Sequence, residues 1–438
     1  METSEVNKAL ELARGRPVCV LGYGVTGRAL AAFLKKESIC HRIFDGNGAF
    51  AKFGVELDFT PRGDEFVIYS PGFIGSQWLR EAQSAGCITI GELDYCQLHR
   101  RGGGQTIAVT GTLGKTSTTM MLEHVLRGLG ERCMATGNVG NPLIGAVDGL
   151  EADENLWNIC EVSSFQAYDM KYFSPDYVIW TNFSPNHLDL HGSLEKYWAA
   201  KLNLLCRCGK TAFVGEDVAA VADRFGQKLP DGVQIAKLSH CGVFGGPLAM
   251  AHQRANYVLV RSLLAAIGFD PSAVDGAICG FRAPPYRLEL WGTVGDVEIW
   301  NDSKATTSAA VAAAIGHVRS TGRKCLWLCC GRGKGEPLEN FRPSVECASA
   351  IICFGEMAPE MTKTFGQKVQ ILDDHRLLFE KIGEFSAGCG DGWAVLFSPG
   401  FTSFDLFSNY MERGEWFDCG MGGLCVRFGG RKSEISVN

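Results

Sequence analysis

The sequence predicts an α/β protein of several domains, and three observations favour this fold class. The chain has 438 residues, more than one hydrophobic core can organise, so two or three domains are expected. Short apolar strands alternate with amphipathic helices throughout, which is typical of parallel sheets covered by helices. In addition, two glycine-rich turns each follow an apolar strand and open a helix, as in nucleotide-binding α/β domains.

Composition argues against several classes of protein. Apolar residues make up 46% of the chain and charged residues 21%, which is ordinary for a soluble globular protein. The net charge of -6 supplies no basic surface, so we expect no nucleic-acid partner. The first residues are polar and no run of about 18 apolar residues occurs, so neither a signal peptide nor a membrane span is expected. The 18 cysteines contain no C-x-x-C pair and lie mostly in apolar runs, which indicates reduced thiols in a cytoplasmic protein.

The first segment of the chain reads as a βαβ series. An apolar strand at 17–22 leads into a glycine turn, and the helix that follows carries Leu30, Phe33 and Leu34 on one face. Further strands are expected at 41–45 and 66–70. The polar, glycine-rich stretch at 99–105 is the expected linker to the next segment.

The second and third segments repeat the alternation of strand and helix. In the second, strands are expected at 106–111, 158–164 and 176–182, with a helix bearing Leu122, Val125, Leu126 and Leu129 and another over 194–206. The third begins after 283–290, and its strands read as VEIWNDS, KCLWLCCG, AIICFG and AVLFSPG.

The turn at 111–116 has the features of a phosphate-binding loop. Gly111 and Gly114 let backbone N–H groups turn toward an anion, and the following helix adds partial positive charge at its N-terminus. Lys115 can reach the outer phosphates of a nucleotide, and the Thr116 hydroxyl suits Mg²⁺. The spacing G-x-x-G-K-T is tighter than the common Walker pattern, so a plain strand-to-helix turn with a surface lysine stays open as an alternative.

Three polar residues of the same segment strengthen the case for a nucleotide site. Glu161, His187 and Lys201 lie at or near the ends of apolar strands or on the following helix, and ligand chemistry in parallel α/β folds gathers at the carboxyl ends of strands. A carboxylate and an imidazole beside a phosphate loop could hold Mg²⁺. Taken singly, Glu161 could cap a helix, His187 could be a loop residue and Lys201 could be solvated.

The turn Gly22-Tyr23-Gly24-Val25-Thr26-Gly27 is a second diphosphate motif. It follows a strand, and Asp45 lies eighteen residues beyond Gly27, which completes a dinucleotide fingerprint. The glycines would serve any diphosphate equally well. This motif therefore leaves open whether the ligand is NAD, FAD or another nucleotide diphosphate.

Seven blocks taken together resemble one known family. TGTLGKTS (110–117), EVSSFQ (161–166), NFSPNHLDLHGS (182–193), YWAAK (197–201), NDSKAT (301–306), CGRGK (330–334) and SPGFTSFDLFSNYMERG (398–414) closely resemble the Mur ligases, in order and over nearly the whole chain. Within the family the match is to the branch that adds D-glutamate to UDP-N-acetylmuramoyl-L-alanine. The resemblance implies ATP, Mg²⁺, an acyl-phosphate intermediate, a monomer and a role in peptidoglycan synthesis. It also implies three α/β domains: a Rossmann-like UDP-substrate domain at 1–100, a P-loop-type ATPase domain at 101–287 and a Rossmann-like amino-acid domain at 288–438.

The resemblance implies roles for individual residues, with Lys115, Glu161, His187 and Lys201 expected to be catalytic. ATP would contact Gly111, Thr112, Leu113, Gly114, Lys115, Thr116, Ser117, Gln253, Arg287 and Asp302. A first Mg²⁺ would be held by Thr116 and Glu161, and His187 would bind a second Mg²⁺ near the acyl phosphate. Lys201 would become an anionic oxygen ligand of the metal if CO₂ carbamylates it. The UDP-linked substrate would contact Gly24, Val25, Thr26, Asp45, Ser70, Gly72 and Asn138. D-glutamate would be held by Lys304, Thr306, Lys334, Ser403 and Tyr410, where two lysines suit a dicarboxylate.

The sequence departs from the family pattern at five positions: Leu113, Asn186, Gln253, Tyr286 and Tyr410. The missing carboxylate at 186 could weaken the metal site. Three alternatives follow: an NAD-dependent oxidoreductase, another Mur or folylpolyglutamate-type ligase, and a catalytically inactive nucleotide-binding protein. The oxidoreductase leaves Lys115, Glu161 and Lys201 without a role. Because ATP contacts are expected on both sides of Arg287, domain closure is also predicted.

Overall fold

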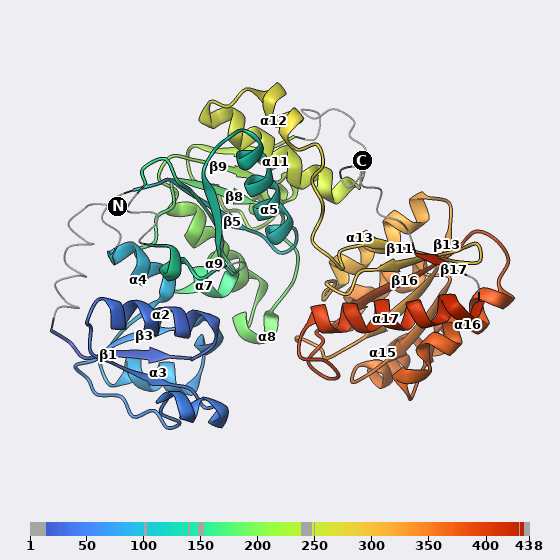
Figure 1. The fold of residues 1–438 in the computed structure, drawn as a ribbon, viewed down its shortest axis with the longest axis horizontal. Coiled ribbons are helices and arrows are strands. Elements are labelled where there is room, and N and C mark those ends of the chain that lie inside the picture. The colour runs from blue at the N-terminus through green and yellow to red at the C-terminus, as the bar shows by residue number, and fades with distance from the viewer. Residues whose placement is uncertain are drawn as a thin grey trace. The chain divides into compact units, whose positions relative to one another are not determined.

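The computed structural model describes residues 15–99, 103–138, 141–147, 153–237, 248, 250–428 and 430–432. They form three sheets with helices on both faces, so the predicted α/β fold class is confirmed (Figure 1). The chain divides into two compact units, Met1–Phe183 with Gly192–Arg282, and Ser184–His191 with Ala283–Asn438. The predicted linker at 99–105 lies partly outside the described residues, and the domain bounds at 100/101 and 287/288 stay a prediction. No helix among these residues combines the length and apolar character needed to cross a membrane.

The first sheet has four parallel strands in the order β2-β1-β3-β4. These strands are β1 (Val18–Leu21), β2 (His41–Phe44), β3 (Phe66–Tyr69) and β4 (Ile88–Gly91), and the helices are α2 (Val25–Lys36), α3 (Gln77–Ser84) and α4 (Glu92–His99). Leu30, Phe33 and Leu34 of α2 pack on one face, as their spacing predicted, while Leu79 and Ala82 of α3 pack on the other. The fold of this segment is therefore the predicted βαβ series.

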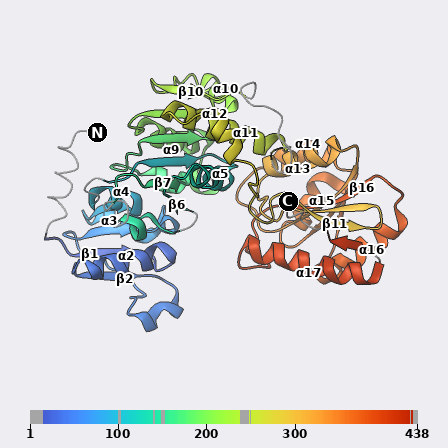
Figure 2. The ribbon, with the colours of Figure 1, turned by 45° about the horizontal axis from the view of Figure 1, so that its top comes forward.

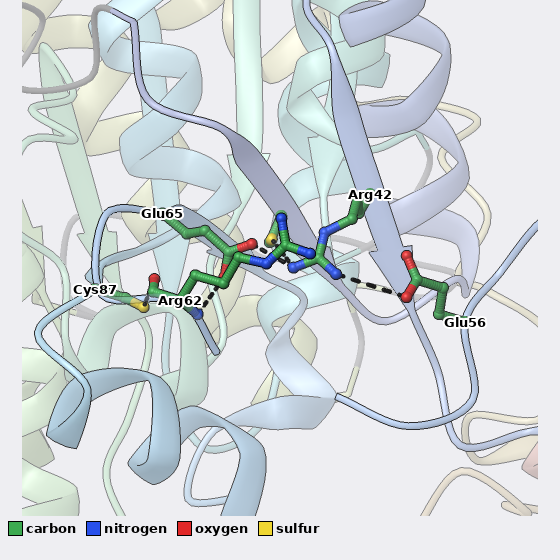
Figure 3. Close-up of polar contacts among 6 residues, drawn as sticks. Arg42, Glu56, Arg62, Glu65 and Cys87 are labelled. Atoms are coloured by element: carbon green, nitrogen blue, oxygen red, sulfur yellow. Dashed lines mark hydrogen bonds and ion pairs between the residues drawn. The ribbon is translucent and has the colours of Figure 1, made fainter. Parts of the chain in front are cut away.

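A charged network links the edge strand β2 to β1 and to Glu65, the residue just before β3 (Figure 3). Arg42 of β2 donates to the carboxylate of Glu65, whose side chain is fully buried, and lies 3.6 Å from Glu56. The second carboxylate oxygen of Glu65 accepts the backbone N–H of Arg62 at 2.8 Å. Arg42 also lies 3.9 Å from the thiol of Cys19 on β1. These contacts join side chains from the start of β1, β2 and β3.

The second sheet has six parallel strands in the order β10-β9-β8-β5-β7-β6. Figure 2 labels β10, β7 and β6 of this sheet. The strands are β5 (Thr106–Thr110), β6 (Cys133–Gly137), β7 (Trp157–Glu161), β8 (Tyr177–Trp180), β9 (Thr211–Val214) and β10 (Val233–Ile235). The helices of this part of the chain are α5 (Lys115–Gly128), α7 (Ser164–Tyr168), α9 (Leu194–Cys206), α10 (Glu216–Arg224), α11 (Ala251–Ile267) and α12 (Pro271–Ala277). The helix predicted over 194–206 is α9, with the same bounds.

Alternate residues of the central strand β5 face two different cores. Ile107 and Val109 pack with α5 and α11 in one cluster, whereas Ala108 packs with α9 in another. The second cluster also contains Leu30 of α2, so the two sheets of the first unit share a continuous core. Because β7, β5 and β8 are neighbours and parallel, their carboxyl ends lie at the same edge of the sheet.

The third sheet has seven strands in the order β15-β14-β13-β16-β12-β11-β17. The strands are β11 (Glu289–Val294), β12 (Val297–Asn301), β13 (Lys324–Cys330), β14 (Ala350–Phe354), β15 (Val369–Ile371), β16 (Trp393–Gly400) and β17 (Gly430–Lys432). The helices of the second unit are α8 (Leu188–His191), α13 (Ser308–Ser320), α14 (Arg342–Cys347), α15 (Ala358–Phe365), α16 (Leu378–Gly388) and α17 (Tyr410–Phe428). α16 and α17 contribute apolar side chains to the main core of this sheet.

The expectation of parallel strands throughout was wrong at one edge of the third sheet. β11 pairs antiparallel with β12 and with β17. Only two residues, Gly295 and Asp296, separate β11 from β12, and Gly295 has a positive φ of 58°. A connection this short can reverse the chain but cannot make the crossover that a parallel pair needs.

Candidate functional site

The loop at 111–116 connects the central strand β5 to α5 and can take only glycine at two positions. Gly111 and Gly114 have φ angles of 149° and 81°. A Cβ atom at Gly111 would lie 1.9 Å from the Thr181 hydroxyl, and one at Gly114 would lie 2.5 Å from Oδ1 of Asn256. α5 begins directly after Gly114, so backbone N–H groups that have no partner inside the helix point out at this end. The geometry suits an anion such as a phosphate.

Two residues that follow β8 hold this loop, and neither was singled out from the sequence. Asn182 accepts the backbone N–H of Leu113 at 2.8 Å and donates to its carbonyl at 3.0 Å. The Thr181 hydroxyl donates to the same carbonyl at 2.5 Å. Leu113 is thus held only through its backbone N–H and carbonyl, and these contacts do not depend on the side chain. The departure from the family pattern at this position therefore leaves the loop intact. Their position at the end of an apolar strand is the sequence signal that could have indicated these residues.

Lys115 folds back over the loop. Its Nζ donates to the carbonyl oxygens of Gly111 at 2.8 Å and Thr112 at 3.0 Å. The alternative of a plain turn with a solvated surface lysine is therefore wrong in its account of this side chain. A lysine held over a glycine loop can move its charge to an arriving phosphate with little displacement.

Lys201 of α9 is buried against the start of the same loop. Its Nζ donates to the Gly111 carbonyl at 2.9 Å and to the Thr110 hydroxyl at 3.3 Å, and the side chain is 1% exposed. Burial is the main cause that lowers the pKa of Lys201 well below its usual value, and the positive charge of Lys115 adds to it, whereas Glu161 opposes it. The reading of Lys201 as a solvated helix residue is wrong. A lowered pKa favours the neutral amine, and the neutral amine is the form that reacts with CO₂.

Tyr197 also belongs to this site, although no role could be assigned to it from the sequence. It lies one turn before Lys201 on α9, and the Nζ of Lys201 lies 4.9 Å from its ring centroid. Its hydroxyl donates to the Thr112 hydroxyl at 3.1 Å. The i, i+4 spacing within YWAAK was the available signal for this pair.

Glu161 ends β7 beside the loop and carries an oxygen without a partner. The side chain is 1% exposed, and Oε1 accepts a hydrogen bond from the Asn138 amide at 2.8 Å. Asn138, expected on the UDP-linked substrate, is thus placed against Glu161. The other oxygen, Oε2, is buried and finds no hydrogen-bond donor within the described ranges. A buried carboxylate oxygen left in this state costs free energy unless a cation or proton reaches it.

The donors at this site fit a magnesium ion that arrives with a nucleotide. No group of three His, Cys, Asp or Glu side chains suited to a metal gathers anywhere in the part of the chain that the structure describes. Magnesium in nucleotide sites takes one or two protein carboxylates and completes its shell with phosphates and water. Glu161 supplies one such ligand, and the Thr116 hydroxyl at the start of α5 could supply another.

His187 belongs to the second compact unit, whereas Glu161 and Lys201 belong to the first. Its backbone φ is positive at 53°, and its N–H donates to the Asn186 side chain at 3.0 Å. The same Asn186 oxygen accepts from Nζ of Lys334 at 3.3 Å. The structure therefore joins His187 to residues of the expected amino-acid site, and its role as a metal ligand stays a prediction.

The first glycine turn is as constrained as the second. A Cβ at Gly27 would overlap the Gly22 carbonyl oxygen at 1.7 Å, and Gly22 itself has a φ of 99°. Gly24 is the N-cap of α2, and Val25 and Thr26 form its first turn. The turn therefore lies at a helix N-terminus, as a diphosphate ligand would require.

Both carboxylate oxygens of Asp45 accept hydrogen bonds from backbone N–H groups, one of them from the glycine turn. Its Oδ2 accepts the N–H of Tyr23 at 2.8 Å, and its Oδ1 accepts the N–H of Asn47 at 2.9 Å. Ser70 follows β3 and has a buried hydroxyl without a hydrogen-bond partner in the described ranges, while Gly72 lies in the single 3-10 turn Pro71–Phe73. Asp45 thus holds the turn in shape, and the Ser70 hydroxyl is available to a ligand.

The residues expected to hold the amino acid follow three neighbouring strands of the third sheet, β12, β13 and β16. Nζ of Lys334 donates to the Thr306 hydroxyl at 3.1 Å. Nζ of Lys304 lies 3.8 Å from the ring centroid of Tyr410, and Ser403 is buried. Two ammonium groups at the carboxyl edge of one sheet could bind two carboxylates.

The expected ATP contacts outside the loop lie in both units. Gln253 of α11 is buried in the first unit, and its Oε1 has no hydrogen-bond partner in the described ranges. Asp302 of the second unit accepts the backbone N–H of Leu288, next to Arg287, at 3.0 Å and the Ser398 hydroxyl at 2.8 Å. Burial raises the pKa of Asp302 to about 7.

Arg413 of α17 is a second residue that the sequence analysis left without a role. It is fully buried and donates to Ser303 Oγ at 3.1 Å, to the Ser303 carbonyl at 2.8 Å and to the Phe401 carbonyl at 3.1 Å. It therefore joins the loops that carry Lys304 and Ser403. An arginine inside the block 398–414 was the signal, but only the contacts reveal what it holds.

Comparison with known proteins decides the family. Residues 109–242 match the model of the Mur ligase middle domain. The chain is also 30% identical to the UDP-N-acetylmuramoylalanine--D-glutamate ligase of Gloeobacter violaceus, over 91% of this chain and 97% of that one. The chain belongs to the Mur ligase family. A relative of the same name from Thermobifida fusca is 30% identical over 92% of this chain and 97% of that one.

Solved structures of Mur ligases share the fold. A UDP-N-acetylmuramate-alanine ligase, MurC, from Thermotoga maritima superposes with a TM-score of 0.57 at 17% identity, covering 93% of this chain and 99% of that one. The MurF ligase of the same organism, solved in complex with ADP, gives 0.57 at 16% identity, covering 88% and 98%. At these identities the likeness shows the fold alone, and it confirms the Mur ligase-like α/β architecture.

Proposed function

We propose that the chain is an ATP-dependent ligase that joins D-glutamate to UDP-N-acetylmuramoyl-L-alanine through an acyl phosphate, in the cytoplasm, as a step of peptidoglycan synthesis. The names of the relatives at 30% identity support the substrates. The observation that carries the proposal is the loop at 111–116, with Lys115 folded over it and the buried, half-satisfied carboxylate of Glu161 beside it.

The proposed chemistry activates the substrate carboxylate, which is a poor electrophile, by converting it into an acyl phosphate with a good leaving group. A carboxylate of the UDP-linked substrate attacks the γ-phosphorus of ATP, ADP leaves, and the acyl phosphate forms. The D-glutamate amine then attacks the acyl carbon, loses a proton, and phosphate leaves as the amide forms. Positioning and charge neutralisation do most of this work in phosphoryl transfer.

The residues divide this work among them. Lys115 and the amides of the loop would bind the β- and γ-phosphates. Thr116 and Glu161 would hold a first Mg²⁺ and His187 a second, and the ions would supply positive charge against the phosphates. Carbamylated Lys201 would add an anionic oxygen. Gln253, Arg287 and Asp302 would contact the nucleotide. Gly24, Val25, Thr26, Ser70 and Gly72 would hold the UDP moiety, with Asp45 shaping the turn. D-glutamate would be bound by Lys304, Thr306, Lys334, Ser403 and Tyr410. We expect the protein to act as a monomer.

The decisive measurement is phosphate release from ATP and Mg²⁺ with UDP-N-acetylmuramoyl-L-alanine and a panel of D- and L-amino acids. D-glutamate is expected to support the fastest release. Stabilisation by NAD but not by ATP and Mg²⁺ in a thermal-shift assay would instead favour an oxidoreductase.

Replacement of the loop lysine tests the site itself. Lys115→Ala is expected to lower phosphate release by at least about 100-fold, because the transferring phosphoryl group loses its main cationic partner. Circular dichroism should show an unchanged fold. The matched control Lys228→Ala removes an exposed lysine of the same unit and should retain full activity. Full activity in Lys115→Ala would contradict the ATP site.

A further inference from the structure

A cavity lies at the amino edge of the second sheet, at the opposite edge from the loop at 111–116. Gln105, directly before β5, and Trp157, the first residue of β7, line it together with Phe269, which follows α11. β5 leads from this edge to the loop, and β7 leads to Glu161. The cavity has a volume of about 320 Å³, which suits a small molecule. None of the described residues that line it belongs to the candidate site above.

Two glutamates bring negative charge to the lining of this cavity. Glu131 is half-buried, and its Oε2 accepts the indole N–H of Trp157 at 3.2 Å. Its Oε1 accepts no hydrogen bond within the described ranges. Glu154 lines the same cavity and is exposed. The indole thus orders the Glu131 carboxylate before any ligand arrives, which lowers the entropy cost of binding.

Basic residues beside the cavity are paired with other carboxylates. Arg132, which precedes β6, lies 2.7 Å from Asp153. Lys210 donates to Gln105 at 2.8 Å and lies 3.1 Å from Asp176. No lysine or arginine of the described ranges lines the cavity itself. The lining therefore carries a net negative charge.

The C-terminal end of α11 adds to this negative potential. The helix has 17 residues and ends at Ile267, which lines the cavity together with Gly268. Its last turn contains no basic side chain, so the helix does not compensate the partial negative charge at its own end. Asp270 follows and caps α12 by accepting the N–H of Ala273 at 3.1 Å. The helix end and the glutamates together favour a cation.

Aromatic rings form part of the wall and decide which kind of cation fits. The ring centroids of Trp157 and Phe269 lie 6.2 Å apart at 55°. Aromatic faces attract cations, tryptophan most strongly. A metal ion fits poorly, because it would find only two carboxylates, and no group of three metal-binding side chains occurs among the described residues. A flat guanidinium or amidinium group can pair with a carboxylate and lie against a ring at the same time.

We propose that this cavity, which we name the Glu131 cavity, is a binding site for a small organic cation that carries a guanidinium or amidinium group. Glu131 pairs with the flat cation, Trp157 orders that carboxylate and offers its ring, and Glu154 adds charge from the exposed side. The inference does not depend on the proposed function, because the cavity shares no residue with the expected nucleotide, substrate or amino-acid contacts.

The test uses calorimetric titration of the full chain with benzamidine, whose amidinium group is flat and positively charged. Benzamide, its neutral isostere, is the comparison ligand. Glu131→Gln removes one charge but keeps an oxygen for the Trp157 indole, and Glu154→Gln removes the other charge. Glu216→Gln, which changes an exposed glutamate of the same unit on α10, is the matched control.

Recognition of charge predicts a specific pattern of dissociation constants. Benzamidine should bind the wild type with a Kd below about 1 mM, and benzamide should bind at least about tenfold more weakly. Glu131→Gln should weaken benzamidine about tenfold and Glu154→Gln about threefold, because water and salt screen the exposed carboxylate more. Glu216→Gln should bind like the wild type.

Three results would each overturn the proposal. One is equal binding of benzamidine and benzamide. Another is unchanged benzamidine binding in the double variant Glu131→Gln/Glu154→Gln. The third is no binding of benzamidine to the wild type up to about 10 mM.

The Trp157 indole reports where the ligand binds. In protein with isotope-labelled tryptophans, the Trp157 indole resonance is the one that is absent from Trp157→Phe. Benzamidine should shift this resonance with the Kd found by calorimetry, and the shift should be lost in the double variant. If benzamidine moves other tryptophan resonances and leaves that of Trp157 unchanged, the ligand binds elsewhere and the Glu131 cavity is refuted as its site.

Discussion

Lys201 is a buried amine that forms no direct ion pair with any carboxylate in the described part of the chain. Its Nζ bonds a carbonyl and a hydroxyl, and both burial and the nearby Lys115 lower its pKa. Neutral lysine is a nucleophile for CO₂, and the resulting carbamate would supply the oxygen that magnesium prefers. The electrostatics of the folded chain thus favour the modification that the family resemblance implies.

Lys201→Ala is expected to lower phosphate release by at least about 100-fold, because a charged ligand of the metal is lost. Added acetate or propionate should restore part of the activity by placing a carboxylate in the vacated space. The control Lys196→Ala changes an exposed lysine of the same helix and should be fully active. Failure of short carboxylates to rescue the variant would count against carbamylation.

Asp302 makes the stability of the second unit depend on pH. Burial raises the pKa of Asp302 from 3.8 to about 7, so between these values the folded state keeps a proton that the unfolded state releases. The stabilisation from Asp302 is therefore complete below about pH 4 and is lost as the pH rises to about 7.

Asp302→Asn should abolish this dependence and leave the hydrogen bonds from Leu288 and Ser398 nearly in place. The free energy of unfolding is measured with urea at pH 5 and at pH 8. From pH 5 to pH 8 it should fall by a few kcal/mol more in the wild type than in the variant, at about 1.4 kcal/mol per pKa unit. Asp391→Asn, an exposed control, should follow the wild type. Parallel pH profiles for wild type and Asp302→Asn would contradict the raised pKa.

At the scale of elements, the edge strand β2 depends on the pair Arg42–Glu65 (Figure 3). Burial alone would raise the pKa of Glu65, but hydrogen bonds from the Arg62 N–H and from Arg42 outweigh it and hold the pKa below its usual value. The pair therefore contributes stability above about pH 4.5 and loses it as the pH falls through the lowered pKa.

Arg42→Met should lower the free energy of unfolding by about 3–5 kcal/mol at pH 7, because it leaves the fully buried Glu65 carboxylate without its cation. Urea unfolding at pH 7 and pH 4 measures the change, which should shrink in acid. Lys228→Met removes a lysine whose ion pair with Asp231 is almost fully exposed, and it should unfold like the wild type. Equal stability of Arg42→Met and wild type at pH 7 would refute this account of β2.

At the scale of the whole molecule, the chain has two compact units with separate cores. The expected UDP contacts all lie in the first unit, and the expected D-glutamate contacts all lie in the second. A ligand stabilises the part of a protein that binds it, by about 2.7 kcal/mol at one hundred times its dissociation constant.

Calorimetry should therefore show two unfolding transitions that respond to different ligands. UDP should raise the transition that Arg42→Met lowers, and D-glutamate should raise the one that Arg413→Met lowers. Arg413→Met removes the three hydrogen bonds of a buried side chain and thus marks the second unit. A single transition, or UDP acting on the transition that Arg413→Met marks, would contradict the division of ligands between units.

The sequence by itself determined the fold class and most elements, because hydrophobic periodicity and glycine turns are local signals. The apolar stripe of α2, the bounds of α9 and the turn at 111–116 all follow from neighbouring residues. It did not predict the antiparallel pairing of β11, although the two-residue connection to β12 was a local signal for it. The pairing with β17 had no such signal, because β17 lies at the far end of the chain. Strand order depends on contacts that no local pattern records.

Only the tertiary structure decided what the polar side chains do. Taken singly, Lys201 could have been a solvated helix residue and Glu161 a helix cap, but packing of α9 and β7 around the loop buries both side chains. For Lys201, this loss of water is the main cause of its lowered pKa. Asn138 turned out to bond Glu161, Asp45 to bond the turn before it, and Arg413 to join two loops. Such roles depend on distances between residues far apart in the chain, which arise only when the sheets assemble.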